Sequence, residues 1–248
     1  MEFRSYRSYR DFANSVTAIW RYNKNDEQND FLQTLHATST GKQETIPGSK
    51  ILWRAQVGHD WGETQVAFDE FEQVPCAFSA TRMKPLKDRA PEGRVNPKGI
   101  PYLYLATDRN TAIAEVRPWI GVYVSVAQLT TVQDLRVVNC ASDDIRRKIY
   151  IQEPSADERE RQVWRDIDQA FAEPVSPSDD YASYVPTQII AEFFRQNGFD
   201  GLAYRSSLGP GRNIALFDLD AAEVVKCSLV QITSVALKSE EVAEPLTQ

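Results

Sequence analysis

Short β-prone segments that alternate irregularly with helical segments are the feature that most constrains the fold of this chain. Strand-like runs occur at 51–55, 102–105, 122–126, 132–138, 202–204 and 214–217. Helical patterns interrupt them near 110–117, 155–171 and 189–197. Regular βαβ units alternate one strand with one helix, whereas here strands also follow one another directly. The pattern therefore predicts an α+β domain.

The first 50 residues are polar with scattered aromatic residues. Apolar residues at helical spacing predict one amphipathic helix that covers the main body and a second, shorter helix: Phe12, Val16, Ile19 and Trp20, then Phe31, Leu32 and Leu35. The stretch from Thr38 to Lys50 carries glycine and proline among polar residues and predicts a loop. We therefore expect an N-terminal helical extension at 1–50, the main domain at 51–235 and a flexible tail at 236–248.

Two helices of the main domain carry local capping signals. Ser155 and Glu158 have the spacing of a capping box, and we expect the acidic helix that follows to be a solvated lid or flank. Asp108 or Thr107 is expected to cap the helix near residue 110, which Pro118 ends. Asn197-Gly198 suits a left-handed cap at the end of the helix before it.

Composition argues against direct nucleic-acid binding and against membrane insertion. The 28 basic and 35 acidic side chains give a net charge of −7, which repels phosphate backbones unless a local patch overrides it. No apolar run approaches the ~20 residues that span a bilayer, and the N-terminus lacks the apolar core of a signal peptide. We therefore expect a cytoplasmic protein with no nucleic-acid or membrane partner.

Metal and disulfide chemistry are also disfavoured. Cys76, Cys140 and Cys227 are odd in number and far apart, unlike a disulfide framework or a zinc site. His36 and His59 have no second histidine at the spacing of metal ligands. We expect buried thiols, no metal and no bound cofactor.

Three segments place polar residues beside strand signals, where burial is costly without a partner. They run from Gly93 to Ala106, from Thr111 to Pro118 and from Phe199 to Asn213. Taken singly, their polar residues have ordinary explanations, such as a solvated arginine, an ion-paired glutamate, a strand tyrosine or a turn serine. Their joint occurrence in this order favours one common site.

Together these segments resemble the RES domain, a family named for its Arg, Glu and Ser. The family's arginine, strand tyrosine, glutamate and serine fall in that order on Arg94, Tyr104, Glu115 and Ser206. Arg54 and Asn213 match further positions that are common in the family and are expected to bind substrate. The resemblance extends from Trp53 to Phe217, with Val95 where many members have tryptophan.

The resemblance implies a fold similar to ADP-ribosyltransferase toxins and an enzyme that consumes NAD+. It implies NAD+ as a substrate, cleaved between nicotinamide and ribose by hydrolysis, phosphorolysis or ADP-ribosyl transfer. It also implies the toxin of a toxin–antitoxin pair, restrained by a helix-turn-helix antitoxin. A protein ADP-ribosyltransferase and a catalytically silent nucleotide-binding sensor stay open as alternatives.

The chemistry of the residue types fits the same assignment. The guanidinium of Arg94, or of Arg54 if the fold brings it close, suits a pyrophosphate. The carboxylate of Glu115 can stabilise the positive charge that develops on ribose as nicotinamide leaves. Tyr104 offers a flat face to the nicotinamide ring, and Ser206 offers a hydrogen bond to ribose or to the carboxamide.

Overall fold

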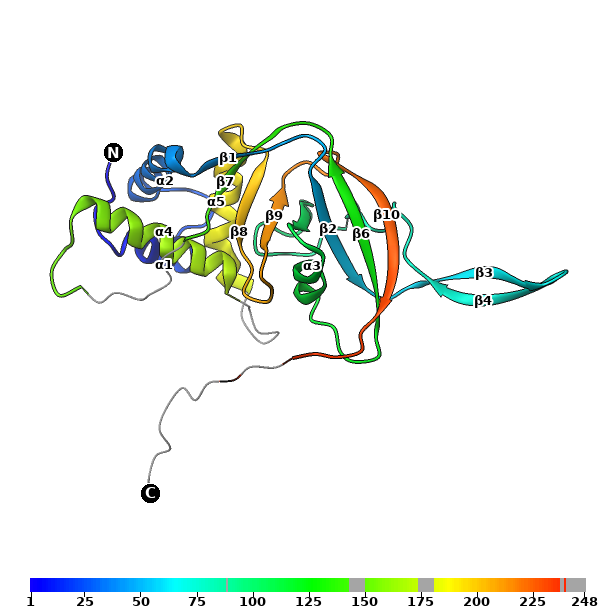
Figure 1. The fold of residues 1–248 in the computed structure, drawn as a ribbon. Helices are drawn as coiled ribbons and strands as arrows, with labels where there is room; N and C mark the ends of the chain where they lie inside the picture. The colour runs from blue at the N-terminus through cyan, green and yellow to red at the C-terminus, as the bar shows by residue number, and fades with distance from the viewer. Residues whose placement is uncertain (88, 143–149, 174–180, 237–238, 240–248) are drawn as a thin grey trace, which may run out of the picture.

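The computed structural model describes residues 1–87, 89–142, 150–173, 181–236 and 239. Within these ranges the chain forms a mixed sheet of eight strands, a separate two-stranded hairpin and five α-helices (Figure 1). The predicted α+β fold class is confirmed. Most of the tail expected at 236–248 lies outside the described residues.

The large sheet has the strand order β1-β7-β8-β9-β5-β2-β6-β10. In chain order its strands are β1 (Gln43–Ile46), β2 (Ile51–Val57), β5 (Leu103–Ala106), β6 (Tyr123–Thr131), β7 (Leu135–Asn139), β8 (Gly201–Arg205), β9 (Arg212–Leu216) and β10 (Ala222–Gln231). Strands β7 and β8 pair in parallel, and the other neighbours pair antiparallel. Mostly antiparallel pairing with helices gathered at one end is typical of α+β domains.

Four helices lie at one end of the large sheet (Figure 1). They are α1 (Ser8–Ala18), α2 (Asp26–Thr38), α4 (Ala156–Ala172) and α5 (Val185–Gln196). Helices α4 and α5 contact β8, and α1 contacts both of these helices, so that their apolar faces share one buried cluster with Leu202 and Tyr204 of β8. The shorter α3 (Arg109–Glu115) contacts β2 instead. Short 3-10 helices occur at Ser39–Lys42 and Tyr181–Tyr184.

Several local predictions are confirmed. All six strand-like runs are present, as β2, β5, β6, β7, β8 and β9. The Asp108 side chain caps α3 by accepting a hydrogen bond of 2.9 Å from the N–H of Thr111. Helix α5 is followed by Gly198 with a φ of +77°, which is the predicted left-handed cap. These features depend on neighbouring residues alone.

The prediction of a loop between Thr38 and Lys50 is wrong, because this stretch contains β1. Strand β1 pairs antiparallel with β7 and so belongs to the large sheet. Its Glu44 accepts hydrogen bonds of 2.7 and 2.8 Å from the guanidinium of Arg212, at the start of β9. These hydrogen bonds lower the pKa of Glu44. The strand partners are far apart in sequence, so no local pattern announces the pairing.

The prediction of which residues the first helix buries is only partly correct. Phe12 and Val16 are buried, but α1 ends at Ala18, and Ile19 and Trp20 are 68% and 54% exposed. Helix α2 covers the region around Phe31 as predicted, over a longer range.

The prediction that the helix at 155–171 is a solvated lid or flank is wrong. Helix α4 buries Trp164, Ile167 and Phe171 in the cluster that it shares with α1 and α5. Its capping box is also absent, because the Ser155 hydroxyl donates to Glu158 at 3.3 Å and accepts no hydrogen bond from the helix backbone. Among the described helices, none has the length and hydrophobicity needed to cross a membrane.

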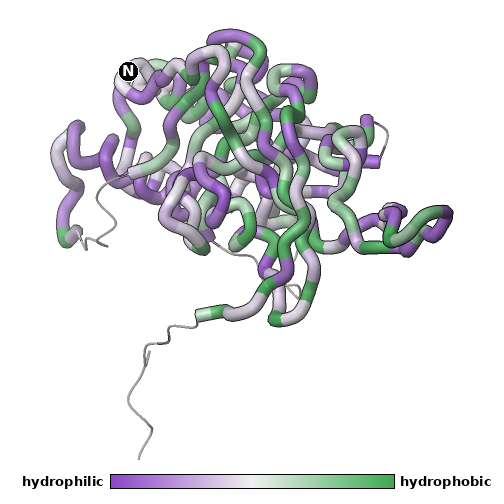
Figure 2. The backbone as a smooth tube through the Cα atoms, turned by 45° about the vertical axis from the view of Figure 1, so that its right-hand side comes forward, coloured by the Kyte–Doolittle hydropathy of each residue, from purple (hydrophilic) through white to green (hydrophobic). Residues whose placement is uncertain are grey.

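A two-stranded hairpin projects from the body, formed by β3 (Asp60–Ala67) and β4 (Glu70–Cys76) (Figure 1). Hydrophobic and hydrophilic segments alternate along it (Figure 2). Most of its side chains are exposed, so it lacks the buried face that makes a strand visible in a sequence. Neither the hairpin nor β10 is predicted from the sequence pattern.

Candidate active site

A pocket of about 310 Å³ opens where the pairing between β2 and β5 ends. These strands share a single register pair, Trp53 with Ala106. Beyond it the carbonyl of Tyr104 accepts a hydrogen bond of 3.0 Å from Arg54 Nη1 in place of a strand N–H. The pocket is lined by Trp53, Arg54, Ala55, Tyr104, Leu105, Ala106, Ala112, Glu115, Val116, Tyr204 and Asn213.

Glu115 is the last residue of α3 and is held by two other predicted site residues. Its Oε1 accepts hydrogen bonds of 2.6 Å from Ser206 Oγ and 2.7 Å from Asn213 Nδ2. Its Oε2 accepts no hydrogen bond from the part of the chain that the structure describes. One carboxylate oxygen is therefore held in place, and the other is left for a ligand in the pocket.

Ser206 follows β8 and orients Glu115. Its hydroxyl donates to the glutamate and accepts from the backbone N–H groups of Leu208 and Gly209, each at 3.1 Å. Because the single hydroxyl proton is already committed to the carboxylate, Ser206 is arranged to position Glu115. Arg205, the preceding residue, lies with its Nε 3.3 Å from the buried carboxylate of Asp168, and this contact connects the end of β8 with α4.

The loop after Ser206 is packed tightly on the start of α3. A Cβ on Gly211 would overlap the Asp108 carboxylate that caps this helix, and one on Gly209 would lie 2.7 Å from the backbone of Thr111. The N–H of Gly211 donates to Thr111 Oγ1 at 2.9 Å. Glycine at both positions therefore lets the loop approach α3 closely enough for Ser206 to reach Glu115.

Arg54 supplies a half-buried positive charge in the pocket. Burial lowers its pKa to about 10. Because this value is still far above neutral pH, the side chain stays protonated there. Its Nε is buried and has no hydrogen-bond partner among the described residues. A buried donor on a cation is costly to leave unpaired, and an anion in the pocket would pair with it.

Arg94 lies outside the residues that line the pocket. Its guanidinium donates to the backbone carbonyls of Phe171 and Glu173, at the C-terminal end of α4. These carbonyls have no partner within the helix, so the arginine caps it. The structure thus gives Arg94 a structural contact, and its expected contact with pyrophosphate stays a prediction.

The hydroxyl of Tyr104 is hydrogen-bonded within the segment that follows Arg94. It donates to Asn96 Oδ1 at 2.7 Å and accepts from the N–H of Val95 at 3.0 Å. Burial raises its pKa far above the ordinary value, so the group stays neutral. Asn96 itself is 3% exposed, and Gln188 of α5 donates to its backbone carbonyl at 3.1 Å.

Tyr104→Phe is accordingly expected to lower the free energy of unfolding by about 1–3 kcal/mol, because Asn96 and Val95 lose a buried partner. A thermal melt measures this change, and Tyr22→Phe, at a side chain 87% exposed, is the matched control. An unchanged Tm together with lost turnover of substrate would instead mean that the hydroxyl acts on the substrate.

Two aromatic side chains of the pocket are missed by the sequence analysis. Trp53 and Tyr204 both line the pocket, and neither is among the predicted site residues. The signal lies in the register, since Trp53 pairs with Ala106 and Tyr204 pairs with Asn213. Directly opposed residues point to the same face of a sheet, but this pairing is not visible in one sequence.

The described residues contain no group of three or more His, Cys, Asp or Glu that is arranged to hold a metal ion. The three cysteines are free thiols, of which Cys140 is buried and Cys76 and Cys227 are partly buried. Arg54, Tyr104, Glu115 and Asn213 thus line one pocket, with Ser206 bonded to its carboxylate. The arrangement suits a ligand that combines anionic, ribose-like and aromatic parts.

Comparison with known proteins assigns most of the chain to one family. The sequence profile of the RES domain family matches residues 51–238, a range that includes all six predicted site residues. No curated protein matches the chain. One chain of the crystal structure of the M. tuberculosis MbcT-MbcA toxin-antitoxin complex is similar, with 14% sequence identity, coverage of 80% of this chain and 92% of that chain, and a TM-score of 0.39. Since the family profile matches residues 51–238, which is well over half of the sequence, the chain belongs to the RES domain family.

Proposed function

We propose that this protein degrades NAD+ by breaking the bond between nicotinamide and ribose. The observation that carries the proposal is the pairing of a fixed carboxylate, Glu115, with a half-buried guanidinium, Arg54, in one aromatic-lined pocket. NAD+ offers a pyrophosphate to the cation, a ribose to the carboxylate and a flat ring to Trp53, Tyr104 or Tyr204.

The reaction needs stabilisation of one developing charge. When the glycosidic bond breaks, both bonding electrons go to the nicotinamide nitrogen, and the ring leaves as a neutral molecule. The ribose C1′ becomes electron-poor, and the free Oε2 of Glu115 stabilises it. Oxygen of water or phosphate then bonds to C1′ and loses its proton to solvent. The cationic leaving group needs no acid, which agrees with a pocket that has one carboxylate.

The biological role proposed here is that of a toxin. Depletion of NAD+ slows growth, and a cell that carries such an enzyme needs a restraint. The similar chain of the MbcT-MbcA complex comes from a toxin-antitoxin pair. We propose an antitoxin of the helix-turn-helix type as the partner, and a cytoplasmic site of action, where NAD+ is available.

Purified protein incubated with NAD+ is expected to release nicotinamide, and mass spectrometry of reactions with and without inorganic phosphate identifies the acceptor. Free ADP-ribose indicates water, a phosphorylated ADP-ribose indicates phosphate, and protein-linked ADP-ribose indicates a transferase. Full activity in excess chelator is expected, because the described residues contain no cluster of His, Cys and carboxylates suited to a metal ion. Expression in cells is expected to lower NAD+ and to slow growth.

Glu223→Gln removes a carboxylate at an exposed position on β10, outside the pocket, and serves as the control variant. It is expected to release nicotinamide at the wild-type rate. If NAD+ binds in calorimetry and stays intact in every reaction, the protein is a silent nucleotide sensor and the proposal fails. If NAD+ neither binds nor disappears at high concentrations of folded protein, the pocket serves another ligand.

A further inference from the structure

The β3–β4 hairpin presents aromatic side chains to solvent. Trp61, Phe68 and Phe71 are 62%, 90% and 64% exposed. The register pairs Trp61 with Pro75 and Phe71 with Gln65, which places Trp61 and Phe71 on one face. A two-stranded hairpin on its own is marginally stable in water, and exposed apolar groups of this size mark contact surfaces. We call the segment 60–76 the hairpin arm.

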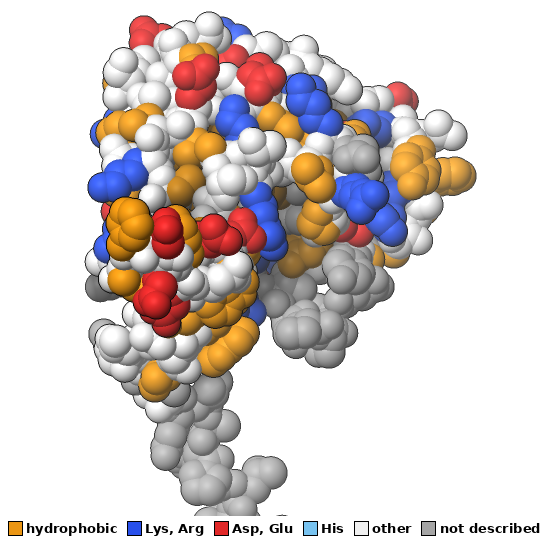
Figure 3. Space-filling view, turned by 90° about the vertical axis from the view of Figure 1, so that its right-hand side faces the viewer, with side chains coloured by type: hydrophobic (Ala, Val, Ile, Leu, Met, Phe, Trp, Pro, Cys, Tyr) orange, Lys and Arg blue, Asp and Glu red, His pale blue; other side chains and the backbone are white. Residues whose placement is uncertain are grey.

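The hairpin arm is also strongly acidic. It contains no lysine or arginine, and its acidic residues are Asp60, Glu63, Asp69, Glu70 and Glu72. Asp60 is paired with Arg82 at 3.1 Å, and the other four carboxylates lie along the arm toward its tip. Figure 3 looks onto this end of the molecule and shows hydrophobic and acidic side chains side by side. Such an arm is repelled by anionic lipid and suits a surface that is both apolar and basic.

The same chain carries such a surface in the connection between α1 and α2. Ile19, Trp20 and Tyr22 are 68%, 54% and 87% exposed there. Arg21 and Lys24 are the charged residues of the segment 19–24, and the acidic residues Asp26 and Glu27 follow in the first turn of α2, where Glu27 is paired with Arg4 at 3.6 Å. We call this segment the basic corner.

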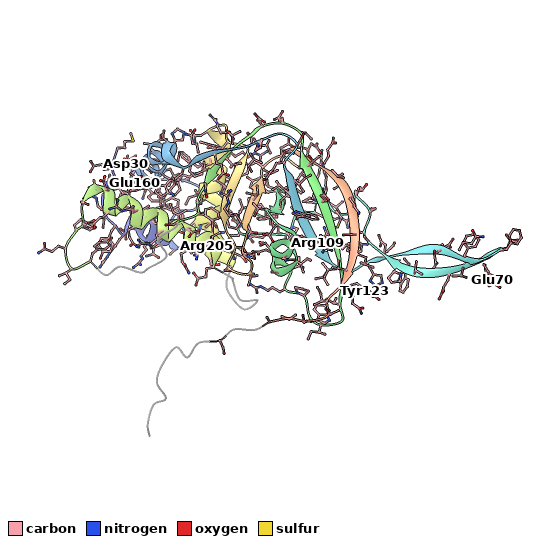
Figure 4. The ribbon with its side chains drawn as sticks, in the orientation of Figure 1. Asp30, Glu70, Arg109, Tyr123, Glu160 and Arg205 are labelled. Atoms are coloured by element: carbon pink, nitrogen blue, oxygen red, sulfur yellow. The ribbon has the colours of Figure 1, made fainter. Side chains whose placement is uncertain are left out.

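The arm and the corner cannot meet within one molecule. Helices α1 and α2, which flank the basic corner, lie at the end of the fold opposite the hairpin (Figure 1). The labelled residues Asp30, on α2, and Glu70, near the hairpin tip, mark these two ends (Figure 4). Complementary surfaces at opposite ends are the arrangement that lets identical molecules join in series.

We propose that the hairpin arm of one copy docks on the basic corner of a second copy, so that the protein associates head to tail. Burial of the aromatic side chains supplies the free energy, and the opposite charges set orientation and partner choice. Because the two surfaces differ, the contact is heterologous, and it closes into a ring or extends as a chain of copies.

Sedimentation velocity of the full chain over a wide range of concentration tests the proposal. The wild type is expected to exceed the 28.1 kDa mass of one chain as concentration rises. An arm variant, Phe68→Ser with Phe71→Ser, and a corner variant, Trp20→Ser with Tyr22→Ser, are each expected to remain monomeric. Ile151→Ser, at a side chain 98% exposed on neither surface, is the matched control and is expected to assemble.

Mixing the arm variant with the corner variant gives the sharpest result. Each retains the surface that the other has lost, so the mixture is expected to form a dimer and nothing larger. A chain that combines Glu70→Lys and Glu72→Lys with Arg21→Glu and Lys24→Glu is expected to assemble again, whereas either pair of charge reversals alone abolishes assembly. Rescue by this swap excludes misfolding as the cause of lost assembly.

Three outcomes would overturn head-to-tail docking. A wild type that stays monomeric at every concentration would assign the arm to a different partner. Assembly that survives the corner variant and not the arm variant would indicate arms that pair with each other. A mixture of the two variants that stays monomeric would show that the two surfaces do not meet.

Discussion

Glu115→Gln is expected to lower the turnover of NAD+ by about 10²–10³-fold while leaving NAD+ binding nearly intact. The carboxylate acts on charge that appears as the glycosidic bond breaks, so its loss raises the barrier without weakening the ground-state complex. This is the largest effect on catalysis that the arrangement of the pocket predicts.

The structure makes this substitution a clean one. Ser206 and Asn213 both donate to a single oxygen, Oε1, and the carbonyl oxygen of glutamine can accept both hydrogen bonds. Glutamine thus keeps the shape and the donors of the site and removes the negative charge. Ser206→Ala, by comparison, leaves the charge and frees its orientation, and is expected to have an intermediate effect.

Isothermal titration measures the affinity for NAD+, steady-state kinetics measures turnover, and thermal melts measure the stability of each variant. Glu223→Gln is the control and is expected to keep the wild-type rate. Wild-type turnover in Glu115→Gln at an unchanged Tm would mean that the glutamate is structural and that the active site lies elsewhere.

Arg54→Met is expected to weaken NAD+ binding by roughly 10–100-fold, whereas Arg94→Ala is expected mainly to lower stability. A hydrogen bond to a charged group contributes about 1.5–3 kcal/mol, which corresponds to that change in affinity. Arg54 lines the pocket with an unpaired buried Nε, and Arg94 bonds the end of α4. The two arginines therefore have separable roles.

Stability provides the second readout for this pair. Arg54→Met relieves the desolvation of a half-buried charge but also removes the donor to the Tyr104 carbonyl, so these opposing effects are expected to change the Tm less than Arg94→Ala does. Arg94→Ala leaves the carbonyls of Phe171 and Glu173 without their donor and is expected to cost about 1.5–3 kcal/mol of unfolding free energy.

Thermal melts and KM values on the same preparations decide between the arginines. Arg54→Lys keeps the charge and loses the planar fork, and an intermediate KM is expected. A raised KM in Arg94→Ala at an unchanged Tm, with Arg54→Met close to wild type, would place the pyrophosphate on Arg94 instead.

The secondary structure around the site could be predicted because it depends on neighbours in the sequence. The cap at Asp108, the left-handed Gly198 and the short apolar strands β5, β8 and β9 follow from local side-chain chemistry and backbone preference. Strand β1 and the hairpin arm escaped prediction, since one owes its place to a distant partner and the other lacks a buried face.

The types of the site residues were likewise readable in the sequence, but their roles depended on the fold. Six positions stood out by residue type and order, and the structure brings Glu115, Ser206 and Asn213 into hydrogen-bond contact across more than 90 residues of chain. Which arginine faces the pocket, and where the Tyr104 hydroxyl points, follow from the strand order and from the single register pair between β2 and β5. These are long-range contacts, and their geometry is decided by sheet register and helix packing, which no local pattern encodes.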